Sequence, residues 1–144
     1  MQKVMASPFR DVILSLDLAS GILEEFAQLP TALAAHSSYL VDDKYLVIYG
    51  GTNGLRFFDN VIRYEIDKKE WRMMQKYPET QKNSPFFKDG RFAGSFALGP
   101  EEDGDQIWVL FGGSSVDKDC NDFLVIHKKH ILNDDNFIVI TEIM

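Results

Sequence analysis

The sequence predicts an all-β fold, built from small four-stranded antiparallel sheets that follow one another along the chain. The first observation is a short β-branched and aromatic run at residues 46–49 that ends at Gly50 and Gly51, as a buried strand entering a tight turn does. The second is residues 60–67, whose side chains alternate so that Arg63 lies on a mostly wet face opposite an apolar one. Short runs of this kind, separated by turn residues, are typical of antiparallel strands.

The middle of the chain holds one complete unit, assigned to residues 31–78. Its four predicted strands lie at residues 34–41, 44–50, 60–67 and 70–77. The connections between them are short enough for an antiparallel meander, in which each strand pairs with the next. This unit therefore predicts one complete sheet.

A shorter unit at residues 11–30 precedes it, with predicted strands at 11–18 and 22–29. The second of these has a helical alternative, because Glu24 and Glu25 favour a helix over a strand. The neighbouring turn residues and the terminating proline favour the strand. This unit is interpreted as half of a sheet.

A degenerate unit is predicted at residues 89–144. Its strands are expected at residues 91–98, 106–111, 121–128 and 137–143. The second strand again ends at a Gly-Gly pair, whereas no Tyr-then-Trp pair follows it. The last two strands are expected to form a hairpin, which would complete a second sheet.

The order of these features resembles the repeat of the kelch β-propeller family. In that repeat an apolar strand ends at Gly-Gly and is followed by a strand with a tyrosine and, seven positions later, a tryptophan, as at Tyr64 and Trp71. Leu16 and Leu23 have the same spacing. The Gly-Gly pairs begin at positions 50 and 112, a spacing of 62 that exceeds the kelch period of about 50. The residues that carry the motif are Gly50, Gly51, Tyr64, Trp71, Gly112 and Gly113.

The resemblance implies a propeller of four-stranded blades, of which this chain supplies about two and a half. Propellers close with about four to eight blades, so we expect an incomplete ring. The chain is then part of a longer propeller, or it self-associates or binds a protein that completes the sheet stack. The resemblance also implies a non-catalytic scaffold or adaptor that presents its loops to a protein partner. The alternative is part of a kelch-fold enzyme, such as a sugar mutarotase, with its site on the propeller axis.

Four residues are candidates for binding a partner. Arg56, Phe57 and Phe58 lie in the loop at residues 52–59, and arginine and aromatic side chains dominate the energy of protein interfaces. The two phenylalanines either face a partner or fold back onto the blade. Arg91 either points into the central channel or forms a buried pair with a carboxylate.

Composition limits the partners. The formal net charge of −7 argues against a nucleic-acid surface, which needs clustered lysine and arginine. No apolar run approaches the roughly 20 residues of a membrane-spanning helix. The single cysteine, Cys120, excludes an internal disulfide and fits a reducing compartment, so we expect a cytoplasmic protein without membrane contact.

No constellation predicts a catalytic residue, a cofactor or a metal. His127 and His130 are three positions apart on a predicted strand and would face opposite sides of the sheet, while His36 stands alone. The copper-dependent kelch enzymes need a cysteine crosslinked to a tyrosine together with further ligands, and Cys120 has no such partner set. The acidic turn at residues 117–121 lacks the glycine and the distant glutamate of a calcium loop.

Overall fold

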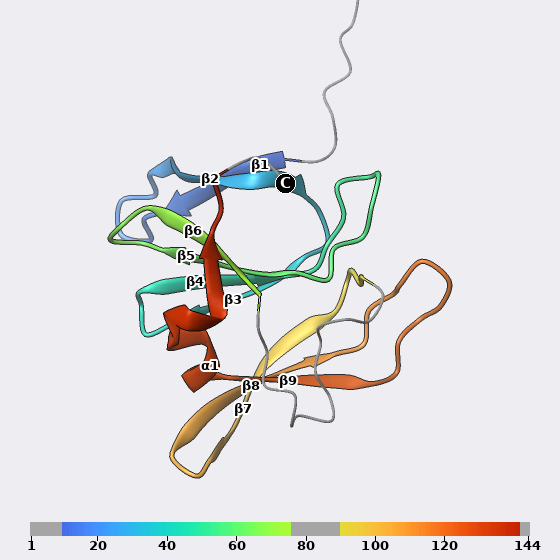
Figure 1. Cartoon of the computed structure of the whole chain (residues 1–144). Coiled ribbons are helices and arrows are strands. Elements are labelled where there is room, and N and C mark those ends of the chain that lie inside the picture. The colour runs from blue at the N-terminus through green and yellow to red at the C-terminus, as the bar shows by residue number, and fades with distance from the viewer. Residues whose placement is uncertain (1–9, 76–89, 142–144) are drawn as a thin grey trace, which may run out of the picture.

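The computed structural model describes residues 10–75 and 90–141, and it confirms the all-β class: three antiparallel sheets, none of them closed (Figure 1). The strands are β1 (Arg10–Leu16), β2 (Leu23–Leu33), β3 (Ser37–Val41), β4 (Tyr45–Tyr49), β5 (Val61–Glu65), β6 (Glu70–Met74), β7 (Ser95–Glu102), β8 (Asp105–Phe111), β9 (Phe123–His127) and β10 (Phe137–Val139). A helix, α1 (Lys128–Leu132), and a 3₁₀ turn, η1 (Asp134–Asn136), precede β10. The ends of the strands predicted at 70–77 and 137–143 reach residues outside the described part.

The middle sheet has the strand order β10-β6-β5-β4-β3. Its four strands β3 to β6 form the predicted meander, and Tyr64 pairs across the strands with Trp71, their ring centroids 4.8 Å apart. Every residue of β5 is buried. The prediction of a wet face for Arg63 and Glu65 is wrong, because both faces of this strand are covered by other parts of the chain.

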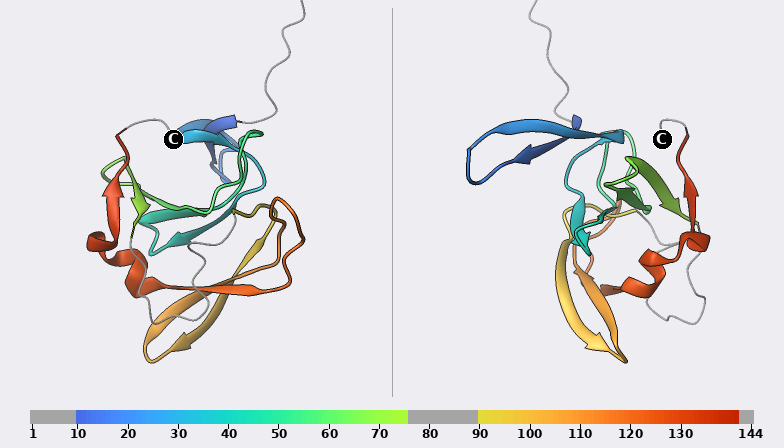
Figure 2. Two further views of the ribbon diagram at one scale, coloured as in Figure 1. Left: turned by 45° about the vertical axis from the view of Figure 1, so that its right-hand side comes forward. Right: turned by 90° about the vertical axis from the view of Figure 1, so that its left-hand side faces the viewer.

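The hairpin β1–β2 covers one face of the middle sheet, and β2 confirms the strand, not the helix, over residues 22–29. Leu16 pairs with Leu23 in the same way as Tyr64 pairs with Trp71, while the equivalence of the two units stays a prediction. The apolar side chains between the two layers are Leu29, Leu33, Ile48, Phe58 and Ile62. Figure 2 shows the hairpin on this side of the middle sheet in both views, with its turn end projecting beyond the sheet in the right-hand view.

The third sheet, β7-β8-β9, packs against the opposite face of the middle sheet. Tyr39 from β3 stacks on Trp108 from β8 with ring centroids 4.6 Å apart, and Phe96 meets Tyr39 edge-on. Leu110 and Leu124 are fully buried in the same cluster. The three sheets therefore form layers in the order hairpin, middle sheet, third sheet.

The last strand differs from the prediction. β10 pairs with β6 of the middle sheet, so the expectation that residues 137–143 form a hairpin with residues 121–128 is wrong. The physical reason is that α1 begins directly after β9 and carries the chain across to the middle sheet. There Arg63 binds the carbonyl of Ile131 (2.7 Å) and the carboxylate of Asp134 (2.5 Å). The other proposed unit boundaries stay predictions.

One hydrogen bond ties the hairpin to the middle sheet, and its loss should be measurable. The indole Nε1–H of Trp71 donates to the carbonyl of Gln28 at 2.8 Å. Trp71→Phe keeps an aromatic ring beside Tyr64 but removes this donor, so we expect a loss of about 1 kcal/mol of stability. Hydrogen exchange of the β2 amides should accelerate more than that of the β8 amides. Equal acceleration in both strands would contradict a local role for this bond.

Candidate protein-interaction surface

The two Gly-Gly pairs begin two long loops that are built in the same way. Gly50 and Gly51 have φ values of 69° and 90°, and Gly112 and Gly113 have 74° and 87°. These angles favour glycine over residues with a Cβ. The amide of Gly50 donates to the carbonyl of Asn60 (3.3 Å), as the amide of Gly112 donates to that of Asp122 (3.2 Å). Both loops therefore leave and re-enter their sheets with the same backbone geometry.

The first loop, residues 52–59, is fixed by its own polar side chains. The hydroxyl of Thr52 donates to the carbonyl of Arg56 (2.8 Å), and the carboxamide oxygen of Asn53 accepts from the amides of Leu55 (2.9 Å) and Arg56 (3.0 Å). A backbone bridge joins Thr52 to Phe57 across the base of the loop. The loop is therefore ordered before any partner arrives.

The phenylalanines of this loop fold back onto the sheets, which was one of the two arrangements left open by the sequence. Phe58 is 2% exposed, and Phe57 stacks on Phe92 with ring centroids 4.8 Å apart. Arg56 is exposed, and its guanidinium lies 4.6 Å from the centre of the Phe58 ring. The residue at the tip is Leu55, which is 93% exposed and which sequence reasoning did not select. The preceding Asn53-Gly54 turn was the signal for that tip.

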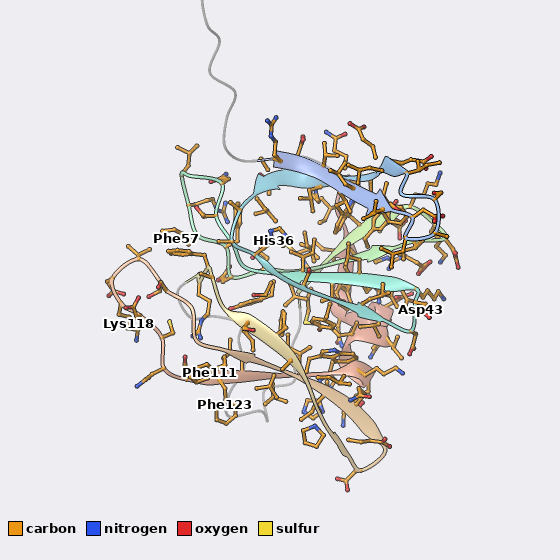
Figure 3. All side chains as sticks on the ribbon, turned by 180° about the vertical axis from the view of Figure 1, so that it is seen from behind. His36, Asp43, Phe57, Phe111, Lys118 and Phe123 are labelled. Atoms are coloured by element: carbon orange, nitrogen blue, oxygen red, sulfur yellow. The ribbon has the colours of Figure 1, made fainter. Side chains whose placement is uncertain are left out.

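The second loop, residues 114–121, repeats this design. Ser114 Oγ lies 2.6 Å from the carboxylate of Asp119, and Ser115 Oγ donates to Asp117 (3.2 Å). Val116 is 75% exposed, and Lys118 is exposed beside it. Figure 3 shows Phe57 and Lys118 at the same end of the layers, with the Asp43 turn at the opposite end. The two loops therefore form one surface, here called the loop face.

Arg91 lies beneath the loop face. Its side chain is 5% exposed and forms an ion pair with Asp122 at 2.8 Å, while Nη1 also donates to the carbonyl of Gly112. Its backbone amide donates to Phe58 and its carbonyl accepts from Gly51. This is the buried carboxylate pairing that the sequence left open, and it joins both loops to each other. A binding role for Arg91 stays a prediction.

The histidines near the end of β9 correct one expectation. His127 and His130 do not face opposite sides, since their ring centroids are 5.3 Å apart. The chain turns from strand to helix after His127, which brings His130 back to the same side. His127 Nδ1 lies 2.7 Å from Asp105. Burial lowers the pKa of His130, and the nearby His127 imidazole acts in the same direction. Within residues 10–75 and 90–141, no group of three or more histidine, cysteine or carboxylate side chains is arranged to hold a metal.

Among the described residues the protein is all-β, with three antiparallel sheets that do not close, an arrangement consistent with part of a kelch-type propeller. Residues 34–76 match the protein-family model described as Kelch motif, so the chain carries a kelch repeat over β3 to β6, as the sequence predicted. That repeat contains Gly50, Gly51, Tyr64 and Trp71. No curated protein matches the chain. In the described part of the chain, no helix is both long enough and apolar enough to cross a membrane.

Proposed function

We propose that this chain is a non-catalytic protein-interaction module that binds a protein partner through the loop face. The single observation that carries the proposal is the pair of exposed aliphatic tips, Leu55 at 93% and Val116 at 75%, on two loops that are each held by internal hydrogen bonds. An aliphatic side chain left this exposed gains free energy when a partner covers it. A kelch repeat is compatible with this role, because kelch propellers commonly serve as interaction modules.

The internal hydrogen bonds that order the two loops are a second argument for binding, besides the exposure of their tips. A loop that is already ordered loses less conformational entropy on association than a flexible one. Arg56 beside Leu55 gives the first loop a positive charge, whereas the second loop carries Lys118 between the exposed carboxylates of Asp117 and Asp119. A partner with a shallow apolar groove and a carboxylate opposite Arg56 fits this combination.

The kind of partner and its location follow from the same features. The net charge of −7 disfavours nucleic acid, and the kelch repeat favours a protein partner. Cys120 is a free thiol, which is compatible with the reducing environment of the cytoplasm. A protein that completes the propeller is the second kind of partner we propose, and the surfaces for it are the two outer faces of the layers.

The test compares two leucines of nearly equal exposure. Leu55→Asp places a charge on the loop face, whereas Leu18→Asp does so at the β1–β2 turn, where Leu18 is 90% exposed. The tagged wild-type chain and both variants are used to capture proteins from cell extract, and captured proteins are quantified by mass spectrometry. We expect at least a tenfold loss of a specific partner with Leu55→Asp, about 1.4 kcal/mol or more, and retention with Leu18→Asp.

Circular dichroism of the three proteins serves as the folding control, because both leucines are exposed and neither contributes to the core. A partner that binds both variants equally well would place the interface elsewhere. A partner lost only with Leu18→Asp would mean that the interface lies on the β1–β2 hairpin and not on the loop face.

A further inference from the structure

One face of the third sheet points away from the middle sheet. The equivalent face of the middle sheet is covered by the third sheet. The two sheets correspond with a constant spacing of 62 residues: the pair Tyr49–Val61 matches the pair Phe111–Phe123. In the middle sheet this pair faces the third sheet and is buried, with 2% of Tyr49 and 0% of Val61 exposed. In the third sheet, Phe111 is 58% and Phe123 is 49% exposed. Figure 3 shows these two rings close together beside β8 and β9.

The β1–β2 hairpin lies at the other end of the layers. Its outward side corresponds to the side of the middle sheet that faces the hairpin. Leu16 and Leu23 correspond to Tyr64 and Trp71, which face the preceding layer in the middle sheet. Ile13 packs on the middle sheet, and successive side chains of a strand point to opposite faces, so Leu14 and Leu16 lie on the outward side of the hairpin. The outward leucines are exposed: Leu14 by 56%, Leu16 by 54% and Leu23 by 59%.

Two contacts inside the chain show how such faces meet. Tyr49 and Val61 of the middle sheet lie in one cluster with Leu110 and Leu124 of the third sheet. On the other side, Ile13 of the hairpin packs with the cluster that contains Ile62. At both contacts the trailing face of one layer covers the leading face of the next. We call the Phe111–Phe123 side of the third sheet the tail face, and the Leu14, Leu16 and Leu23 side of the hairpin the head face.

We propose that the tail face of one chain packs on the head face of a second copy of the same chain, in a head-to-tail ring. The chain carries both complementary faces, one at each end of its layers, and each is apolar. A contact between two different patches on identical chains is heterologous and closes into a ring when the rotation per chain permits.

This proposal rests on the second kind of partner proposed above, the one that completes the propeller, and names it as another copy of the chain. It uses the outer faces of the layers and not the loop face. The copies repel each other electrostatically, because each carries a net charge of −7. Salt screens this repulsion and leaves apolar contacts in place. Association should therefore strengthen when the ionic strength rises from low values to about 0.5 M.

The experiment uses two variants that each disable one face. Phe111→Ser with Phe123→Ser removes the tail face, and Leu16→Ser with Leu23→Ser removes the head face. Leu55→Ser on the loop face is the control. Sedimentation velocity over a range of concentrations at about 0.5 M salt should find the wild type and the control associated, and each face variant monomeric.

The mixture of the two face variants is the decisive sample. It contains one intact head and one intact tail, so a head-to-tail contact predicts a dimer that neither variant forms alone. A tail-to-tail contact predicts that the head variant still associates and that mixing adds nothing, which would overturn the proposal. A wild-type chain that stays monomeric at every concentration would overturn it as well, and would leave the faces to a different protein.

A crosslink tests the same geometry without disabling either face. In a Cys120→Ser background, Leu16→Cys is introduced in one chain and Phe123→Cys in another. Mixing under mild oxidation should give a disulfide-linked heterodimer in large excess over either homodimer. A predominance of the homodimers would contradict the head-to-tail arrangement even if the serine variants fail to fold.

Discussion

Replacing Arg63 with methionine is expected to destabilise the fold by about 3 kcal/mol. The guanidinium is fully buried, donates to the carbonyl of Ile131 at 2.7 Å and pairs with Asp134. It also lies 4.6 Å from the ring centre of Tyr45 and 4.3 Å from that of Phe137. Methionine fills much of the volume but leaves the buried carbonyl without this donor and ends both cation–π contacts.

The measurement is urea denaturation of Arg63→Met, followed by hydrogen exchange. The exchange of β10 and α1 amides should increase most, because Arg63 joins their segment to β5 of the middle sheet in addition to the pairing of β10 with β6. A variant within 0.5 kcal/mol of the wild type, with unchanged exchange in β10, would contradict this role for Arg63.

The matched control is Asp134→Asn, which removes the charge of the other partner. The Asp134 side chain is 52% exposed, so its pair with Arg63 is partly solvated, and we expect a loss below about 1 kcal/mol. The hydrogen bond from Arg63 lowers the pKa of Asp134 from 3.8. A depressed pKa in the folded state stabilises the fold above the unfolded value, and this stabilisation disappears as the pH falls through the folded pKa. The difference between Asp134→Asn and the wild type should therefore be present at pH 7 and shrink below about pH 4.

Replacing Gly50 with alanine is expected to cost at least about 3 kcal/mol. Gly50 has a φ of 69°, and an added Cβ would lie 2.4 Å from the carbonyl oxygen of Arg91. That oxygen belongs to the backbone and accepts from the amide of Gly51 at 3.0 Å, so it cannot move away without breaking a bond beneath the loop face. Thermal and urea denaturation should both report the loss.

Gly21→Ala is the matched control for the backbone angle. Gly21 has a φ of 73°, and a Cβ there would meet nothing within 4 Å. Gly21→Ala is expected to lower the free energy of unfolding by about 1 kcal/mol, because only the unfavourable positive φ of a residue with a Cβ contributes. Equal losses for the two variants would mean that the close approach of Arg91 to Gly50 contributes nothing.

Local patterns in the sequence were enough to predict most of the strands. The apolar run ending at Gly50 and the alternation around Tyr64 are short-range signals, and the strands they predict are present. The pairing of Tyr64 with Trp71 followed from a spacing of seven within one hairpin. Such signals depend on the residues beside them, so a single sequence reveals them.

The parts that could not be predicted depend on contacts between distant segments. Arg63 alternates like an exposed residue, and only the arrival of α1 and β10 buries it. The partner of β10 is set by long-range packing, since its apolar residues would suit either sheet. The binding candidates Phe57 and Phe58 were chosen by residue type, whereas exposure at the loop tip depends on the Asn53 hydrogen bonds.

The pairing of β10 with β6 also constrains how the protein can be made. Phe137 pairs with Met74, and the whole third sheet lies between them in the chain. During synthesis the middle sheet cannot acquire its outer strand until residues 137–139 have left the ribosome. Pairings so distant in sequence slow folding, because closing the long intervening segment costs conformational entropy before the contact between β6 and β10 forms. The outer edge of β6 is therefore open until residues 137–139 have emerged, and a chaperone that shields β-strand edges would have its opportunity there.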